Sequence, residues 1–551
     1  MNDIYTRLQE HARLTPDKPA VWEYVGNSEF RCVSRGELAG QAEVLAAKFR
    51  QEVEPGHAIP ILMGRTATCV AAILGALGAG LPFSCINPKY RGPQIECILT
   101  SLGSPLVLAE ASTLVSLRTE FQQGSVLSDK RWIIVPRTRD QQLYRKMLSR
   151  IAQGVDIEEL SLSPHAKTLA ACGEGQGNVG CCLFTSGSTG EPKGVLISVD
   201  DLRDRAVAEV DWYGLTEADV LLNLLPFSFD VGLNQLLSVI WAGSEVVLLN
   251  SWMPADILRV CEMRGITGIS NVPSIWRDML AADAVIQRKV GRRALRYVTI
   301  SGGDLDSKGL ESLPRIVPGA GIYKTYGQTE TFRSSSLHPD DYPSRPTSVG
   351  RAFGRAKFYI VDDAGACCGP NVEGQVVHTG LGTMIGYLCG MEQDEKLRPN
   401  PFYGDSDSAT QGIFTGDFGY TDCDGYLYLR GRRDDMVKIQ GNRVYPAEVA
   451  AQLMRVDGIT AAEVLPVGLA NGMTTLCAFV SGMPHACPSL SGLRIAVTKR
   501  LPSYMVPSYF VFRDALPRTP NGKIDRMALY RHAATVAGTT NALSADSYHV
   551  R

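Results

Sequence analysis

The chain has 551 residues, of which 45% are hydrophobic and 20% charged, with a formal net charge of −2. This length is too great for one hydrophobic core and predicts two or more domains. The balanced charge argues against nucleic acid or an anionic membrane as the partner, because both favour a strongly basic face.

Helical patterns alternate with short apolar runs in the first part of the chain, which predicts parallel β/α layers. The amphipathic stretch Gly36–Phe49 is followed by the apolar runs Ile59–Leu62, Leu106–Leu108 and Trp132–Val135. No charged residue lies between Arg65 and Lys89, but the stretch is built mainly of Ala and Gly and is broken by Pro82, Ser84 and Asn87. We therefore expect a buried helix and a buried strand in this stretch, and no integral membrane segment.

A Gly-rich segment, Cys172–Gly180, separates these layers from a second alternating region. The pattern becomes β-rich after about residue 345 and changes at Gly431 to a smaller α+β segment, with a polar tail, Ala533–Arg551, expected to be frayed. The strands predicted in the second region are Val220–Leu225, Glu245–Leu249, Gly268–Asn271, Tyr297–Ser301 and Gly321–Thr325.

The predicted fold class is α/β. Residues 1–433 are expected to form a large N-terminal domain of β/α-layered subdomains plus a β-rich subdomain. Residues 434–551 are expected to form a small, mobile α+β C-terminal domain.

The 14 cysteines are scattered, without a CxxC knuckle or a histidine at ligand spacing. Adjacent cysteines such as Cys181–Cys182 point to opposite faces of a strand, so they are poorly placed to share one ion. The N-terminus Met1–Gln9 is polar and lacks the pattern of an export signal. Reduced thiols in a cytoplasmic protein are the favoured interpretation.

The segment Leu183–Ser198, LFTSGSTGEPKGVLIS, predicts a phosphate-binding loop between two strands. Glycines let backbone N–H groups face an anion, hydroxyls add donors and a lysine adds charge. It is not a Walker A loop, because Lys193 is followed by Gly194 and no helix begins there. The alternative is a Ser/Gly hairpin with a surface lysine. The residues predicted to contact phosphate are Thr185, Ser186, Gly187, Ser188, Thr189, Gly190 and Lys193.

This loop resembles the phosphate-binding signature of the adenylate-forming superfamily, which includes acyl-CoA synthetases, luciferases and nonribosomal-peptide adenylation domains. Further motifs of that family follow in order, so the resemblance spans most of the chain. It implies ATP and Mg²⁺ as cofactors, and activation of a carboxylic acid as its acyl-adenylate before transfer to a thiol.

The segment Tyr326–Glu330, YGQTE, is similar to the adenine motif of that family. The resemblance implies that Tyr326 stacks on adenine and that Glu330 binds Mg²⁺, which prefers carboxylate and phosphate oxygens. Taken alone, the segment is equally compatible with a helix start and a capping acid. The other nucleotide-binding positions that the resemblance implies are Gly302, Gly303, Gly327 and Thr329.

Phe414–Asp417, FTGD, resembles the ribose motif, in which Asp417 accepts both ribose hydroxyls. Arg432 matches the arginine that reaches the same region, and Asp434 matches the interdomain hinge. Without the resemblance, these segments are an ordinary turn and a solvated run of charge.

Pro517–Asp525 resembles the final motif of the family. Its Pro-Asn-Gly turn is expected to present Lys523 on a loop. The resemblance implies that Lys523 is catalytic and contacts the substrate carboxylate and the α-phosphate, where negative charge grows. An exposed lysine on a β-turn is the alternative.

Phe229-Asp230 matches the branch of the family that activates amino acids, in which the aspartate pairs with the substrate α-ammonium. A carboxylate in an apolar pocket is costly without a cation, which such a substrate supplies. The alternative is an N-cap for a helix over Val231–Val239. The remaining pocket positions carried over from the family are Val231, Asn234, Asn271, Thr299, Ser301, Thr325, Arg333 and Ser334.

Arg333 leaves two substrate classes open. If it fills the pocket, the substrate is glycine or alanine. If it grips a carboxylate, the substrate is acidic. Departures from the peptide-synthetase pattern are Gln328, where proline is usual, and the extra basic residue Arg433.

The chain ends soon after Asp525, which predicts that the thiol acceptor is the phosphopantetheine of a separate holo carrier protein. The whole chain resembles free-standing glycine–carrier-protein ligases of lipid A aminoacylation. A short-chain acyl-CoA ligase is the nearest alternative, and a non-catalytic nucleotide-binding protein is an alternative of another class.

Overall fold

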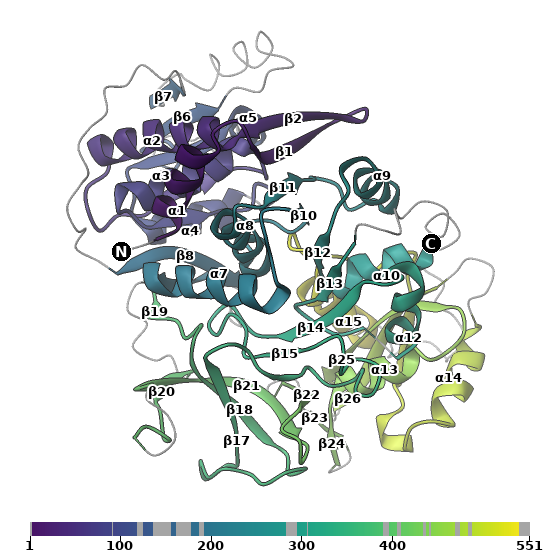
Figure 1. Ribbon diagram of the computed structural model, residues 1–551. Helices are drawn as coiled ribbons and strands as arrows, with labels where there is room; N and C mark the ends of the chain where they lie inside the picture. Colours follow the sequence, from purple (N-terminus) through teal and green to yellow (C-terminus); the bar gives the residue numbers. More distant parts are fainter. Residues whose placement is uncertain are drawn as a thin grey trace.

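The structure is a computed structural model, and its elements are arranged as two large sheets with helices, a β-rich sheet and a smaller C-terminal group (Figure 1). The residues that it describes are 3–90, 92–117, 125–135, 156–160, 178–186, 192–282, 295–305, 307–388, 396–404, 409–432, 437–439, 442–468, 474–482 and 488–538.

The largest sheet has nine strands in the order β16–β15–β14–β13–β12–β10–β11–β1–β2. The neighbours from β14 through β1 are parallel, and helices α8 (Asp230–Ala242), α9 (Pro254–Arg264), α10 (Pro273–Ala281) and α12 (Ser307–Ile316) lie between these strands in sequence. The strands are β1 (Pro19–Gly26), β2 (Glu29–Ser34), β10 (Val220–Asn223), β11 (Glu245–Leu248), β12 (Gly268–Asn271), β13 (Tyr297–Ile300), β14 (Gly321–Tyr326), β15 (Ser335–Leu337) and β16 (Arg351–Ala352).

The second sheet has eight strands in the order β19–β9–β8–β4–β3–β5–β6–β7. Its strands are β3 (Ile59–Leu62), β4 (Phe83–Cys85), β5 (Leu106–Glu110), β6 (Arg131–Val135), β7 (Asp156–Glu159), β8 (Val179–Ser186), β9 (Pro192–Ser198) and β19 (Gly386–Tyr387). The helices of this part of the chain are α1 (Ile4–Leu14), α2 (Arg35–Glu52), α3 (Ala67–Ala79), α4 (Gly92–Leu102), α5 (Ala111–Ser116) and α7 (Val199–Tyr213).

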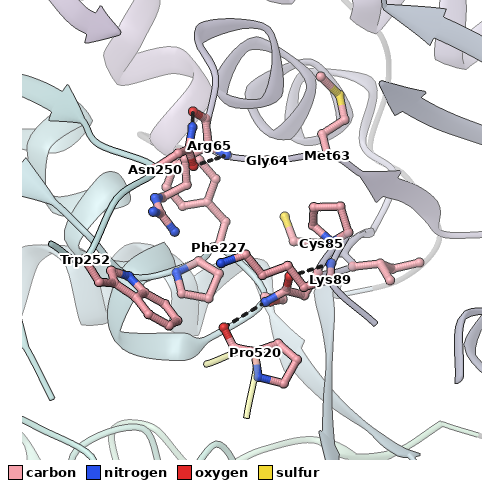
Figure 2. Close-up of a pocket in the computed structure, with 14 residues that line it drawn as sticks. Met63, Gly64, Arg65, Cys85, Lys89, Phe227, Asn250, Trp252 and Pro520 are labelled. Atoms are coloured by element: carbon pink, nitrogen blue, oxygen red, sulfur yellow. Dashed lines mark hydrogen bonds between the residues drawn. The ribbon is translucent and has the colours of Figure 1, made fainter. Parts of the chain in front are cut away.

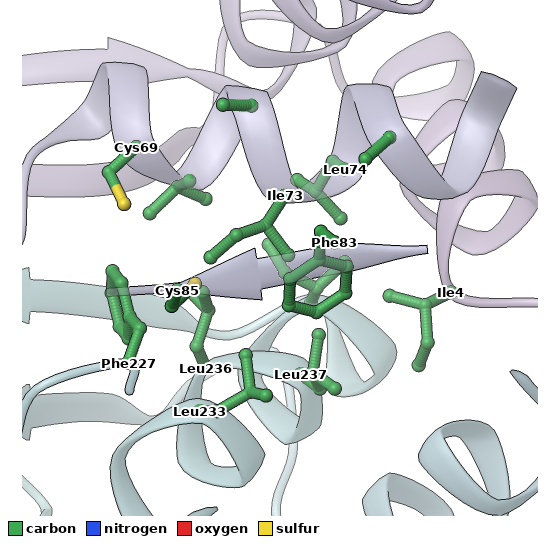
Figure 3. Packing of buried hydrophobic residues seen from close by; sticks show 14 of the residues in the cluster. Ile4, Cys69, Ile73, Leu74, Phe83, Cys85, Phe227, Leu233, Leu236 and Leu237 are labelled. Atoms are coloured by element: carbon green, nitrogen blue, oxygen red, sulfur yellow. The ribbon is translucent and has the colours of Figure 1, made fainter. Parts of the chain in front are cut away.

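The main hydrophobic core joins the two sheets through α3, β4 and α8 (Figure 3). Thr66 caps α3 by accepting from the N–H of Cys69, and Gly80 ends the helix in a left-handed conformation. Phe83 of β4 is fully buried beside this helix. The uncharged stretch is therefore a buried helix followed by a buried strand, as predicted. Among the described residues, no helix is long and apolar enough to cross a membrane.

The β-rich region pairs β17 with β18, β18 with β21, and β21 with both β20 and β22. The C-terminal group has its own core, formed by a three-stranded sheet and helices. These elements are β17 (Ala356–Val361), β18 (Gly374–Gly380), β20 (Leu397–Pro399), β21 (Gln411–Thr421), β22 (Leu427–Arg432), β23 (Val437–Ile439), β24 (Asn442–Val444), α13 (Pro446–Leu453), β25 (Ile459–Gly468), β26 (Thr474–Gly482), α14 (Leu490–Thr498), η2 (Ser503–Met505), β27 (Tyr509–Phe512) and α15 (Arg526–Gly538).

The α/β fold class and every strand named from the sequence are confirmed. The predicted tail was wrong in one respect, because α15 continues through Gly538 and buries Leu529 and Ala533 against the C-terminal sheet. Cys181 and Cys182 lie in different hydrophobic clusters, as expected for opposite faces of a strand. Every cysteine that the structure describes is a free thiol. The boundary between residues 433 and 434 lies outside the described residues and stays a prediction.

Candidate active site

The candidate site lies at the carboxyl edge of the nine-stranded sheet. Parallel strands place their carboxyl ends at one edge, so Ser301, after β13, and Tyr326, at the end of β14, come close together. Asp230 joins them from the start of α8, which follows β10. The approach is tight, because a Cβ at Gly232 would lie 2.5 Å from the carbonyl oxygens of Leu225 and Pro226. This contact fixes the segment that carries Asp230.

These residues enclose a small cavity of about 40 Å³. About 10–15 Å³ of such space is enough for one water molecule, so the cavity is small but holds more than one. The C-terminal Lys523 reaches the same cavity from a distant part of the chain. The lining residues are Phe229, Asp230, Val231, Ser301, Gly302, Thr325, Gly327, Gln328, Thr329, Phe332, Arg333 and Lys523.

The loop that carries Lys523 is docked on the rest of the molecule. Gly522 has a φ of +82° and donates its N–H to Thr519 at 2.9 Å, which confirms the predicted turn. Ser274 of α10 donates its hydroxyl to the Gly522 carbonyl at 2.6 Å. Arg518 forms a bidentate pair with Asp278 of α10, with distances of 2.8 and 2.9 Å. These contacts hold Lys523 at the cavity, while part of the residue stays exposed to solvent, as expected for a lysine on a β-turn.

Asp230, which is buried, and Lys523, which is partly exposed to solvent, are charges of opposite sign that line this cavity. Burial raises the pKa of the Asp230 carboxyl, and Lys523 acts against that increase. Burial likewise lowers the pKa of the Lys523 ammonium, and Asp230 opposes the decrease. Asp230 begins α8, but within the described part of the chain its carboxylate accepts a hydrogen bond from the adjacent Val231 N–H alone, at 2.9 Å, and the N-cap position is Phe229. The helix-cap alternative therefore does not account for this side chain.

Gly302 brings the backbone against the lysine. A Cβ at this position would lie 3.1 Å from Cε of Lys523 and 3.2 Å from Cζ of Phe229, and its φ is +74°. Gly302→Ala is therefore expected to displace the lysine and to lower the activity predicted from the sequence, acyl-adenylate formation, by about tenfold or more, while the fold is kept. Pyrophosphate exchange measures the loss, and the thermal midpoint tests the fold. Wild-type exchange in this variant would contradict the positioning of Lys523.

A hydrogen-bond network joins the predicted adenine and ribose motifs. The Tyr326 hydroxyl donates to Oδ2 of Asp417 at 2.7 Å, and Gln328 Nε2 donates to the same oxygen at 2.6 Å. Arg432 Nε lies 3.5 Å from Oδ1 of Asp417. Burial raises the pKa of Asp417, while Tyr326, Arg432 and Gln328 oppose the increase. Gln328, a departure from the usual proline, thus orients the aspartate predicted to hold the ribose.

Glu330 lies in a second polar cluster. Its Oε1 accepts from the Tyr387 hydroxyl and from Lys396 Nζ, both at 2.7 Å. Burial opposes ionisation, but Lys396 and Tyr387 outweigh it and hold the pKa of Glu330 below its ordinary value. An ionised carboxylate suits Mg²⁺, which is commonly held by one carboxylate plus substrate phosphates. No group of three or more His, Cys, Asp or Glu side chains at metal-binding distance occurs within the described residues.

Arg333, which lines the cavity, already has partners within the protein. Its guanidinium lies 2.5 Å from Glu209 Oε1 and donates to the Tyr213 hydroxyl at 2.7 Å. Ser238 donates to the other oxygen of Glu209 at 2.9 Å. Arg333 and Glu209 are only 2% and 3% exposed, so the pair is fixed in a closed network. Two nitrogens of the Arg333 guanidinium are therefore occupied by Tyr213 and Glu209. This disfavours Arg333 as the residue that binds a substrate carboxylate.

The other predicted pocket residues fall into two groups. Val231, Ser301 and Thr325 line the cavity, and the hydroxyls of Ser301 and Thr325 lie 2.7 Å apart. The residues that do not line it are Thr299, which is hydrogen-bonded below Ser301 at 3.2 Å, and the buried Asn234, Asn271 and Ser334.

The phosphate loop is described only at its two ends. Thr185 of β8 pairs with Lys193 of β9 in an antiparallel hairpin, and Lys193 Nζ lies 5.9 Å from the centre of the Tyr387 ring. The hairpin thus directs the lysine toward the Glu330 cluster. Gly303 lies beside Pro273, with 3.4 Å from its ideal Cβ to the ring. The remaining predicted positions fall outside the described residues or their described side chains: Ser186, Gly187, Ser188, Thr189, Gly190, Arg433 and Asp434.

A protein-family model and several known proteins are similar to this chain over most of its length. A family model described as "AMP-binding enzyme" matches residues 8–388. Bacitracin synthase 3 of Bacillus licheniformis is 28% identical over 98% of this chain, and gramicidin S synthase 2 of Brevibacillus brevis is 26% identical over 96%. The chain spans only 8% and 11% of the length of these two relatives.

Solved structures share the fold at lower identity. ATP-bound MatB from Rhodopseudomonas palustris superposes with a TM-score of 0.78 at 21% identity, covering 97% of this chain and all of that chain. A holo four-domain nonribosomal peptide synthetase bound to AMP and glycine gives a TM-score of 0.78 at 24% identity, with this chain fully covered and 37% of that chain matched. These likenesses support the α/β architecture described above.

Proposed function

Because the chain belongs to the AMP-binding enzyme family, we propose that it activates a small amino acid, glycine before alanine, as its aminoacyl-adenylate with release of pyrophosphate. The observation that carries this proposal is the meeting of Asp230 and Lys523 in one small cavity at the carboxyl edge of the sheet. A substrate with an ammonium beside its carboxylate complements the two charges.

The proposed reaction assigns one task to each cluster. Asp230 binds the substrate ammonium, and Lys523 stabilises the charge that grows as the substrate carboxylate attacks the α-phosphate of ATP. Asp417, held by Tyr326 and Gln328, binds the ribose. Glu330 is the residue proposed to hold Mg²⁺, which neutralises charge on the phosphates of ATP.

The small size of the cavity and the fixed position of Arg333 support a substrate with a small side chain. About 40 Å³ is available, and Arg333 is held by Glu209 as part of the wall. The structural relative bound to AMP and glycine agrees with this choice. The test is a hydroxylamine-trapping panel of amino acids and short acids with the purified chain. Glycine and alanine are expected to respond; silence of both beside a response to an acidic or long substrate would overturn the assignment.

Glu209→Gln is expected to change the substrate preference. The amide keeps the size of the side chain but removes the charge that neutralises Arg333, so the guanidinium becomes available to a substrate carboxylate. We expect activation of aspartate to rise by about tenfold relative to glycine in pyrophosphate exchange. Glu217→Gln, which removes a surface carboxylate paired with Lys18, is the matched control. An unchanged ratio of aspartate to glycine would show that Glu209 does not set the specificity.

The second half-reaction is proposed to pass the aminoacyl group to the phosphopantetheine thiol of a separate holo carrier protein, after a swing about Asp434. Incubation with a holo carrier or with CoA, followed by mass measurement, separates this proposal from an acyl-CoA ligase.

The resemblance of the whole chain extends the proposal to a cytoplasmic enzyme that supplies glycine for lipid A. Lipid A from cells lacking the enzyme is then expected to lack the added mass of glycine.

A further inference from the structure

A second cavity, of about 130 Å³, lies beside the candidate active site. The segment 226–228 forms part of its wall, and the next two residues, Phe229 and Asp230, line the first cavity. Figure 2 shows Arg65, Lys89 and Trp252 around this opening, with Pro520 of the lysine loop at its edge. Asn87 donates to the Pro520 carbonyl at 3.3 Å, so the cavity lies directly beneath the docked loop.

The cavity gathers positive charge without negative charge. Arg65 is 7% exposed, and burial lowers its pKa to about 10, so it remains a cation at neutral pH. Lys89 Nζ lies 4.6 Å from the centre of the Trp252 ring at the mouth of the cavity. Burial, and then Arg65, lower the pKa of Lys89. No Asp or Glu is among the described residues that line this space.

Donors with no partner point to a missing acceptor. Arg65 uses Nη2 to donate to the Leu249 carbonyl at 2.6 Å, but its buried Nε has no hydrogen-bond partner in the part of the chain that the structure describes. The hydroxyl of Ser228, which is 7% exposed, likewise has no hydrogen-bond partner among the described residues. A buried donor without an acceptor is costly, and two like charges in one cavity add to that cost. An anion in the cavity removes both costs.

We propose that this second cavity is a binding site for a phosphate dianion, either free inorganic phosphate or the terminal group of a small phosphomonoester. Two cations balance a dianion, whereas a monoanion leaves one positive charge without a partner. Arginine and lysine with a hydroxyl form the donor set that phosphate oxygens prefer. The volume holds several waters and is sufficient for one phosphate group. This site is separate from the predicted loop for the phosphates of ATP, which follows β8.

Isothermal titration calorimetry of the full chain tests the site. Inorganic phosphate, glycerol phosphate and acetate are titrated in turn while a non-hydrolysable ATP analogue saturates the nucleotide site. One phosphate probe is expected to bind at a single site, with acetate about tenfold weaker or more because it carries half the charge. Tighter binding of inorganic phosphate identifies the free ion as the ligand, and tighter binding of glycerol phosphate identifies a monoester.

Lys89→Met removes one cation at the mouth and leaves the buried Arg65 in place, so the fold is expected to survive. The affinity for the preferred phosphate should fall about tenfold or more, the loss of one charge-assisted hydrogen bond. Lys499→Met, a change at an exposed lysine, is the matched control and should bind as the wild type does. Arg65→Lys, which keeps the charge and removes the Nε donor, should also weaken binding. The proposal is overturned if neither phosphate binds, if acetate binds equally well, or if Lys89→Met binds like the wild type.

Discussion

Lys523→Ala is expected to lower the rate of adenylate formation by about 10²–10³-fold, the loss typical of one electrostatic donor at a transition state. The lysine is the C-terminal group that reaches the cavity shared with Asp230, and its loop is held by Ser274 and Asp278. Pyrophosphate exchange with glycine measures this first step. Transfer from supplied aminoacyl-adenylate to the acceptor should remain largely intact, because no charge then grows at phosphorus.

Two comparisons make the result for Lys523 decisive. Lys499→Ala removes an exposed lysine of the same C-terminal region and should leave both steps unchanged. The thermal midpoint of Lys523→Ala should fall only slightly: the buried Asp230 loses an opposing charge, but Lys523 is itself partly exposed and its loop stays held by Ser274. Equal loss of adenylation and of transfer would contradict the proposed division of labour.

Asp230→Asn is expected to lower kcat/KM for glycine by about 10²-fold or more. Removal of one partner of a buried ion pair costs about 3 kcal/mol or more, because the substrate ammonium is left uncompensated. Acetate, which has no ammonium, should lose far less and serves as the internal control. A similar loss for glycine and for acetate would show that Asp230 acts on the fold and not on the ammonium.

The ionisation of Asp230 predicts that kcat/KM for glycine depends on pH. Burial raises the pKa of Asp230, with Lys523 opposing the increase, and only the ionised form binds an ammonium. The value of kcat/KM for glycine should therefore fall as the pH decreases through this raised pKa, which lies above the ordinary value of an aspartate. The variant Asp230→Asn should not show that limb of the profile. A limb that persists in the variant would assign the titration to another group.

The parts of the site that follow strands could be predicted from the sequence. The resemblance to the adenylate-forming family predicts Asp230, Ser301, Tyr326 and Lys523. The structure brings the first three together because the parallel strands end at one edge of the sheet. Apolar patterns predict the strands and their order, and family motifs predict which residues at the strand ends belong to the site.

Contacts between distant segments could not be predicted in this way. Glu209 pairs with Arg333, and Lys396 pairs with Glu330, although nothing in the local pattern marks either partner. Asn234 is expected in the pocket lining but is buried and does not line the cavity, because the face of a helix that a cavity reaches depends on packing. The buried Arg65 belongs to no motif, and its neighbours in sequence predict only a hydrophobic core.

The most direct test of the account is the identity of the nucleotide product. The chain is incubated with glycine, Mg²⁺ and ATP labelled at the α-phosphate, without a thiol acceptor. The products are then separated and identified by their masses. Glycyl-AMP bound to the protein, together with pyrophosphate in equal amount, is the predicted result. Release of ADP and inorganic phosphate, or no turnover with any amino acid or short acid, would contradict it.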